Sequence, residues 1–195
     1  MNTEVMLDLE TLGNKPRSVI VAIGAVKLKD GVITDRFYKR VDAASCVQAG
    51  LRVDVDTVMW WLKQESEARL EITKPGDPLS VVLWDFAEWL GCTDAEVWGN
   101  GAAFDNVLLA DAFDNVLLAD AYDACSIQRP WKFWNDRCHR TMKSLFPQVP
   151  MQRSGTHHNA LHDAETQAVH LMAIRKHTLS KTLHYHDATR SRTAA

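Results

Sequence analysis

Two acidic residues near the amino terminus, Asp8 and Glu10, are the first side chains of this sequence that could do chemistry. They end an apolar run that begins at Val5, and one residue separates them. Because alternate side chains of an extended strand point to the same face, a strand here would place both carboxylates together. Adjacent carboxylates repel unless a cation lies between them, and Mg²⁺ and Mn²⁺ prefer oxygen ligands. The pair therefore predicts a metal site, but a strand that ends in a polar turn would carry the same pattern.

A third carboxylate follows a short strand expected over residues 96–101, which ends in a glycine turn. A helix that begins near Ala103 would place Phe104 and Asp105 in its first turn, where the helix dipole favours an acid. Asp105 is therefore either an ordinary N-terminal acid or a third metal ligand.

The last group of candidates lies near the carboxyl end, where helical periodicity covers residues 161–177. Asp163 falls near the start of this helix and His158 just before it, so the two side chains can meet at one place. Histidine titrates near neutral pH and can act as a general base. A zinc centre built from His157, His158 and His162 is the competing interpretation, because imidazoles suit zinc.

A tandem duplication interrupts the middle of the chain, where residues 104–112 recur without change as residues 113–121. Nine residues make roughly 2.5 turns of α-helix, so Asp105 and Asp114 would face opposite sides of an unbroken helix. We expect Asp105 to be the working copy, because the glycine turn before it fixes it to the sheet. Asp114 is the alternative, with the first copy looped out. A helix through both copies would be apolar nearly all round, which suggests extra burial or a homodimer contact through Leu117 and Leu118.

The other elements follow from periodicity and turn residues. Consecutive strands are predicted at residues 5–11, 19–26 and 32–41, which implies an antiparallel meander. Helices are predicted at residues 56–62, 66–73, 79–90 and 140–145, and the aromatic cluster at 130–134 either packs on the core or stacks bases. One domain over residues 1–178 and a flexible tail over 179–195 are expected.

Composition is that of one ordinary globular domain. The chain has 195 residues, 46% of them hydrophobic and 24% charged, with a formal net charge of -3. This charge argues against a broad basic surface for duplex nucleic acid, but metal ions could supply positive charge in a narrow site. The four cysteines form no Cys-x-x-Cys pair, and no apolar run is long enough to cross a membrane. A cytoplasmic protein with reduced thiols is expected.

Taken together, the motifs resemble those of a known family. Asp8-x-Glu10-Thr11, then Asn100-Gly101-x-x-Phe104-Asp105, then His158-x-x-x-x-Asp163 match in order and spacing the three motifs of the DEDDh 3′-to-5′ exonucleases. Residues 8–16, 60–64 and 98–101 look most like small exonucleases carried by phages and prophages, some described as exodeoxyribonuclease VIII. That branch is similar to a mycobacterial exoribonuclease. The duplication is a departure from the family pattern.

The resemblance implies an α/β, ribonuclease H-like fold with a mixed central sheet flanked by helices. It implies a 3′-to-5′ exonuclease that releases 5′-mononucleotides from single-stranded DNA or RNA. The resemblance leaves the choice between the two polymers open, and we expect DNA to be slightly preferred. An exoribonuclease with the same mechanism and an inactive relative that only binds nucleic acid are the alternatives.

The resemblance also assigns roles to residues. Two Mg²⁺ or Mn²⁺ ions would be held by Asp8, Glu10, Asp163 and either Asp105 or Asp114, and His158 would take the proton of the attacking water. The residues expected to contact the substrate are Thr11, Leu12, Asn100 and Phe104.

Overall fold

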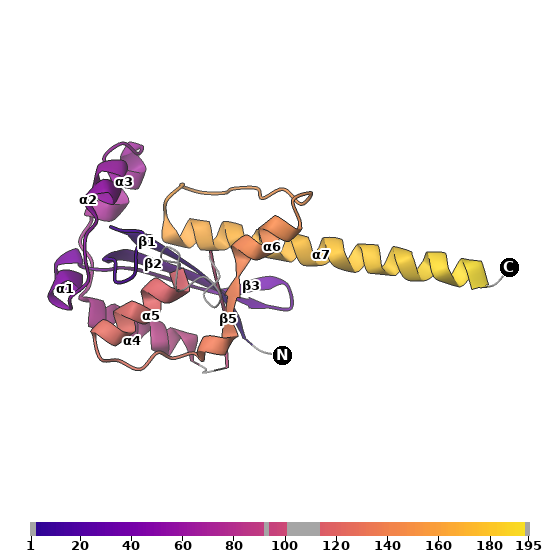
Figure 1. The fold of residues 1–195 in the computed structure, drawn as a ribbon, viewed down its shortest axis with the longest axis horizontal. Coiled ribbons are helices and arrows are strands. Elements are labelled where there is room, and N and C mark those ends of the chain that lie inside the picture. The colour runs from indigo at the N-terminus through magenta and orange to yellow at the C-terminus, as the bar shows by residue number, and fades with distance from the viewer. Residues whose placement is uncertain (1–2, 92–93, 101–113, 194–195) are drawn as a thin grey trace.

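The computed structural model describes residues 3–91, 94–100 and 114–193, with side chains described up to Ser180. Its centre is a five-stranded sheet in the order β3-β2-β1-β4-β5 (Figure 1). The strands are β1 Glu4–Thr11, β2 Ile20–Lys29, β3 Val32–Arg40, β4 Glu96–Gly99 and β5 Asp136–Cys138.

The sheet is mixed, as predicted. Strands β1, β2 and β3 form the expected antiparallel meander, whereas β4 pairs parallel with β1, and β5 pairs parallel with β4. Consecutive strands are joined by turns in the meander, while the parallel pairs need longer crossover connections. The carboxyl ends of β1 and β4 therefore lie at the same end of the sheet.

Helices cover both faces of the sheet (Figure 1). On one face, α4 and α5 pack on alternate side chains of β1, namely Val5, Leu7 and Leu9. On the other face, α7 packs on Met6 and its neighbours. The α-helices are α1 Ala43–Gln48, α2 Val55–Trp61, α3 Ser66–Thr73, α4 Leu79–Leu90, α5 Asp114–Ala124, α6 His139–Leu145 and α7 Ala160–Thr193, with a 3-10 turn at Phe133–Asn135.

Helix α7 runs past its expected end near residue 177 and continues to Thr193. A flexible tail is predicted for residues 179–195, and α7 extends into this segment because residues 178–193 contain no glycine or proline that would end the helix. Figure 1 shows the last turns of α7 projecting beyond the sheet.

The duplicated segment supplies α5 from its second copy. Leu117 and Leu118 are 3% and 0% exposed and belong to the main core. They therefore do not form the homodimer contact that the sequence suggested. The first copy, including Phe104 and Asp105, lies outside the described residues.

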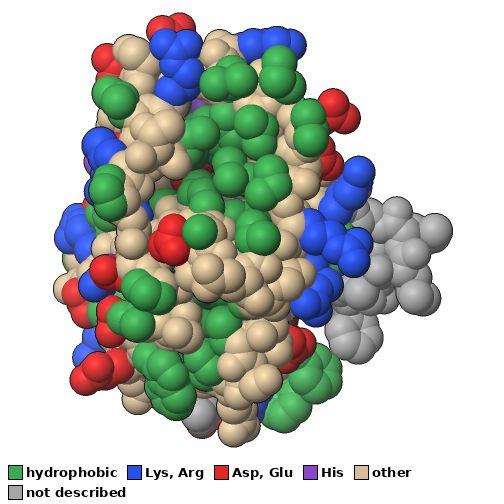
Figure 2. All heavy atoms as spheres, turned by 90° about the vertical axis from the view of Figure 1, so that its left-hand side faces the viewer, with side chains coloured by type: hydrophobic (Ala, Val, Ile, Leu, Met, Phe, Trp, Pro, Cys, Tyr) green, Lys and Arg blue, Asp and Glu red, His purple; other side chains and the backbone are tan. Residues whose placement is uncertain are grey.

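The aromatic cluster divides between core and surface. Trp131 is buried against the core, whereas Phe133 and Trp134 are largely exposed. Hydrophobic side chains are also exposed at the end of the molecule that Figure 2 faces, and those on α2 include Val55 and Met59. None of the helices within the described residues combines the length and hydropathy needed to cross a bilayer.

Candidate active site

Asp8 and Glu10 lie on the α7 face of β1, as their spacing predicted, near the carboxyl end of the strand. Ligand atoms of Asp8, Glu10 and Asp163 all lie within 4.8 Å of one another. Three carboxylates from two distant segments therefore converge at one point, as a dication site with oxygen ligands requires.

Helix α7 can bring Asp163 to this point because β2 carries a glycine where the helix crosses it. Gly24 pairs with Asp8 in the sheet, and a Cβ on Gly24 would lie 2.1 Å from the carbonyl carbon of Ala160. Asn159 caps the helix, since its Oδ1 accepts a hydrogen bond from the backbone N–H of His162 at 3.2 Å. The first turns of α7 are thus fixed beside the acidic pair.

A fourth carboxylate belongs to Asp114, the first residue of α5. Its Oδ2 accepts a hydrogen bond from the backbone N–H of Asn100 at 3.0 Å, directly after β4. Its charge raises the pKa of both Asp8 and Glu10, which places it beside them. Asp105, the copy that the sequence favoured, lies outside the described residues, so the alternative residue Asp114 is the one observed beside the acids.

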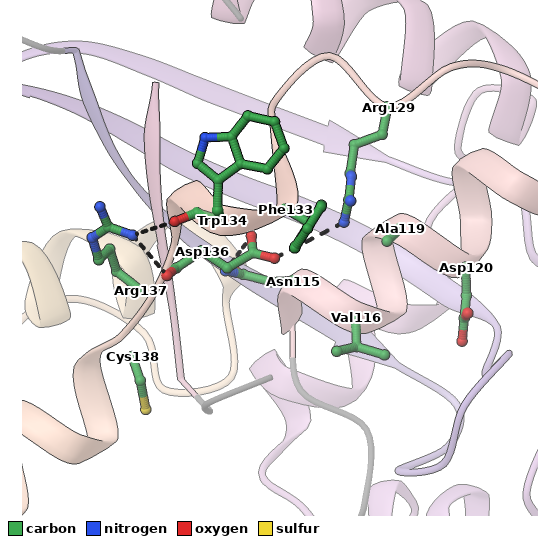
Figure 3. Close-up of a pocket in the computed structure, with 10 residues that line it drawn as sticks. All are labelled: Asn115, Val116, Ala119, Asp120, Arg129, Phe133, Trp134, Asp136, Arg137 and Cys138. Carbon is green, nitrogen blue, oxygen red and sulfur yellow. Dashed lines mark hydrogen bonds and ion pairs between the residues drawn. The ribbon is translucent and has the colours of Figure 1, made fainter. Parts of the chain in front are cut away.

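The next residue, Asn115, anchors α5 to two strands. Its Nδ2 donates to the carbonyl oxygen of Val97 at 2.9 Å and to Oδ1 of Asp136 at 3.1 Å. Figure 3 shows Asn115 and Asp136 side by side in the lining of a cavity of about 560 Å³. The close approach needs Gly99, where a Cβ would lie 2.2 Å from Oδ1 of Asn115.

The acids themselves border a smaller cavity of about 230 Å³. Gln167 donates from Nε2 to Oδ1 of Asp8 at 2.7 Å, and Arg153 donates from its guanidinium to Oδ1 of Asp163 at 3.0 Å. Other residues that line this cavity are Leu9, Glu10, Asn100, His139, Lys143, Met151, His157, His158 and Thr166.

Burial and neighbouring negative charges raise the pKa values of Asp8, Glu10 and Asp114. The pKa of Asp8 is raised well above its usual range by burial and by the charges of Asp114, Glu10 and Asp163. Burial, Asp163 and Asp114 also raise the pKa of Glu10, and burial raises the pKa of Asp114 to about 6. The cluster therefore needs protons or a cation to be stable.

His158 stands at the edge of the same cavity in a left-handed backbone conformation, with φ of 58°. Its backbone N–H donates to Oδ2 of Asp163 at 3.3 Å, and its ring contacts Trp60 and Trp61 edge to face, with centroids 4.9 and 5.6 Å away. Burial and the neighbouring His157 lower the pKa of His158, which keeps the imidazole neutral and able to accept a proton.

The residues expected to contact the substrate are placed as follows. Asn100 lines the acidic cavity, and Thr11 lines an adjoining cavity of about 390 Å³ together with Trp60 and Trp61. Leu12 is only partly buried and packs against the core, while Phe104 lies outside the described residues.

The zinc centre proposed from three histidines is not assembled as the sequence suggested. Nδ1 of His162 instead accepts a hydrogen bond from the backbone N–H of Thr156 at 3.0 Å. The imidazoles of His157 and His158 group with Asp163.

Several residues of the site were missed from the sequence. Gln167 lies four residues after Asp163, so helical spacing alone could have placed it on the same face. Trp60 and Trp61 are predicted in a helix and belong to a segment that resembles the small exonucleases, but no role at the site follows from either observation. Arg153 lies in an irregular loop with no periodic signal. Their contacts with the site depend on tertiary packing.

The chemistry of the ligand set fits divalent cations. Glu10 is 6% exposed, yet its Oε1 has no hydrogen-bond partner within the described residues. A buried carboxylate oxygen without a partner is costly, and a bound cation would satisfy it. Asp8, Glu10, Asp114 and Asp163 are the residues that would hold such ions.

Solved exonucleases have the same fold. E. coli exonuclease I in complex with a 5cy-dA13 oligonucleotide superposes with a TM-score of 0.56 at 12% identity, covering 90% of this chain and 41% of that chain. Exonuclease I from Methylocaldum szegediense gives 0.61 at 10% identity, with 90% and 41% covered. The nuclease domain of 3′hExo, a DEDDh family member bound to rAMP, gives 0.54 at 13% identity, with 89% and 90% covered.

These likenesses confirm the predicted ribonuclease H-like α/β fold. The chain spans about two fifths of the length of the exonuclease I chains that it matches. No curated protein sequence matches it as a relative. One family model covers residues 3–175, and this range contains Asp8, Glu10, Asp114, His158 and Asp163. The chain therefore belongs to the family described as the 3′-5′ exoribonuclease Rv2179c-like domain.

Proposed function

We propose that this protein is a metal-dependent 3′-to-5′ exonuclease that hydrolyses phosphodiesters at the 3′ end of single-stranded nucleic acid and releases 5′-mononucleotides. The observation that carries the proposal is the convergence of Asp8, Glu10 and Asp163, with Asp114 beside them and His158 at the rim. Family membership supports the reaction class.

We assign Asp8, Glu10, Asp114 and Asp163 as the ligands of two divalent cations, Mg²⁺ or Mn²⁺. Such ions would activate the attacking water and neutralise the phosphoryl oxygens. His158 accepts the proton of that water, because its lowered pKa leaves the ring unprotonated at neutral pH. Trp60 and Trp61 hold the ring by edge contacts, and its backbone N–H is tied to Asp163.

The positive side chains of Arg153 and Lys143 border the acidic cavity and are suited to contact a phosphate. In the protein alone, Arg153 pairs with Asp163. We infer that this guanidinium turns to the substrate when cations occupy the acids, since both compete for the same carboxylate.

The adjoining cavity suits the terminal nucleoside. It shares Leu9 and Glu10 with the acidic cavity, so the two cavities are neighbours. Trp60 is 43% exposed there and offers a surface on which a base can stack. Thr11 borders this cavity, and Asn100 borders the acidic cavity. We propose that both contact the substrate.

DNA and RNA are both candidate substrates. The sequence suggested a slight preference for DNA, which stays a prediction. The family description favours RNA as the alternative substrate.

The resemblance to small phage exonucleases stays a proposal, and so does a cytoplasmic location. Cys46, Cys125 and Cys138 are free thiols, in keeping with a reducing compartment.

The test uses end-labelled single-stranded DNA and RNA of the same sequence, incubated with Mg²⁺, Mn²⁺ or a chelator. We expect stepwise shortening from the 3′ end that requires a dication, with 5′-mononucleotides as products. Asp8→Asn is the control that should abolish cleavage. If Asp8→Asn digests as fast as the parent, the metal assignment is wrong; if neither polymer is cut, the chain is a binding relative without activity.

A further inference from the structure

His157 and His158 form, with Asp163, a second ligand cluster beside the carboxylates. One ligand atom from each residue lies within 4.8 Å of the other two. The left-handed backbone at His158 turns consecutive side chains to the same side, so that the two imidazole centroids are only 3.8 Å apart. Adjacent histidines in an extended chain would point to opposite faces.

The two clusters differ in ligand chemistry but share one residue. Asp8, Glu10 and Asp163 offer only oxygen, which suits Mg²⁺ and Mn²⁺, whereas the histidine cluster offers two imidazoles and one carboxylate. Imidazole nitrogen favours borderline cations such as Zn²⁺, which is bound by three protein ligands where a water fills the fourth position. His157 is exposed, so solvent can reach the cluster.

We propose that His157, His158 and Asp163 bind a Zn²⁺-class cation at a second site that overlaps the carboxylate site through Asp163. The ligand atoms of one bound ion lie closer to one another than 4.8 Å, and the exposed side chain of His157 has room to move toward the other two ligands. Arg153 must leave Asp163 when the cation enters, as it must for any dication at this residue.

Occupation of this site is inhibitory, and that consequence rests on the proposed function. The cation takes the lone pair with which His158 accepts a proton, and it draws Asp163 away from the carboxylate cluster. The protein would therefore be activated by cations that prefer oxygen ligands and inhibited by cations that prefer imidazole ligands. The two sites exclude each other because both use Asp163.

The binding itself is tested without any activity measurement. Metal-free protein is titrated with Co²⁺ as a spectroscopic substitute for Zn²⁺, since tetrahedral Co²⁺ absorbs visible light far more strongly than the octahedral ion. We expect a tetrahedral spectrum that Zn²⁺ abolishes, and affinity at least about tenfold lower in His157→Asn. His177→Asn is the matched control, because His177 lies well along α7 and contacts Gln148. An unchanged spectrum in His157→Asn would overturn the site.

The inhibitory consequence has its own experiment. Zn²⁺ is added to Mg²⁺-activated cleavage of a labelled oligonucleotide, and each variant is normalised to its own rate without Zn²⁺. We expect the half-inhibitory Zn²⁺ concentration to rise at least about tenfold in His157→Asn and to stay unchanged in His177→Asn. Equal inhibition of both variants would refute the overlap. If no variant cuts nucleic acid, the proposed function fails while the Co²⁺ titration still decides the site.

Discussion

The carboxylate of Asp114 accepts a hydrogen bond from the backbone N–H of Asn100 at 3.0 Å, which fixes the start of α5 to the end of β4 beside Asp8. Asp114 belongs to the second copy of the nine-residue duplication. Its amide variant should therefore remove one metal ligand and leave the first copy unchanged. We expect Asp114→Asn to lower the cleavage rate about 100-fold or more. Rates of labelled oligonucleotide digestion at saturating Mg²⁺ measure the effect.

Asp105→Asn is the matched control for that variant, because Asp105 occupies the same place in the first copy. If Asp114 supplies the metal ligand, Asp105→Asn should cleave within about twofold of the parent. A dead Asp105→Asn protein beside an active Asp114→Asn protein would reverse the assignment of the third ligand.

Removal of one copy of the duplication should preserve the enzyme. Deleting residues 104–112 gives the same chain as deleting residues 113–121, because the copies are identical. The shortened chain keeps one Phe-Asp-Asn sequence after the glycine turn, and this supplies both the carboxylate and the anchoring amide. We expect cleavage within about threefold of the parent, measured with the same oligonucleotide. Loss of the fold by circular dichroism would show that the extra copy is structurally required.

Much of the fold could be predicted from local pattern. The strand alternation around Asp8 and Glu10, the meander and helix α4 follow from periodicity and turn residues, and Gly91 ends α4 in the left-handed conformation expected of it. The motifs also predicted that His158 and Asp163 join Asp8 and Glu10, and the structure places all four around one cavity.

The rest depended on information that a local pattern lacks. Two identical copies have identical propensities, so only packing against β4 and β5 selects Asp114 and Asn115. The edge strand β5 has three residues and no periodic signal. Helical spacing puts Gln167 on the same face as Asp163, but its hydrogen bond to Asp8 joins segments far apart in sequence, as does the contact of Trp60 with His158.

Gln167 should tune metal affinity through Asp8. Its amide holds Oδ1 of Asp8 at 2.7 Å, and Gln167→Leu removes the donor while keeping a side chain of similar size. We expect the Mg²⁺ concentration for half-maximal activity to rise about 10- to 100-fold. Gln148→Leu, on an exposed residue, is the control and should leave that concentration unchanged. A rise only in the KM for oligonucleotide would assign Gln167 to substrate binding instead.

Gly24 should be essential to the approach of α7. A Cβ there would lie 2.1 to 2.4 Å from backbone atoms of Ala160 and Leu161, so Gly24→Ala must displace the helix that carries Asp163. We expect a loss of about 3 kcal/mol in the free energy of unfolding by urea, together with weaker metal binding. Gly31→Ala meets no atoms within 4 Å but has a φ of 76°, and should cost about 1 kcal/mol. A loss in Gly24→Ala no larger than the loss in Gly31→Ala would mean that the packing of α7 does not depend on a glycine at this position.

The acidic cluster should make the metal-free protein less stable as pH rises. Burial and repulsion raise the pKa values of Asp8, Glu10 and Asp114 in the folded state, so the folded protein holds protons that the unfolded chain releases. Their contribution is complete below the ordinary carboxyl pKa and is lost as pH rises through the raised values.

With a pKa near 6, Asp114 alone should cost about 1 kcal/mol between pH 5.5 and 7.5. Urea unfolding at both pH values in chelator measures the difference. Saturating Mg²⁺ should cancel it, because bound cations replace the protons, and Asp114→Asn should reduce it because the amide does not titrate. Burial lowers the pKa of His139 to about 4, and this group contributes in the opposite direction over the same range, so the contribution of Asp114 is read from the comparison of the parent with Asp114→Asn. If the parent and Asp114→Asn change equally in stability between the two pH values, the pKa of Asp114 is not raised, and the case for a cation beside it falls.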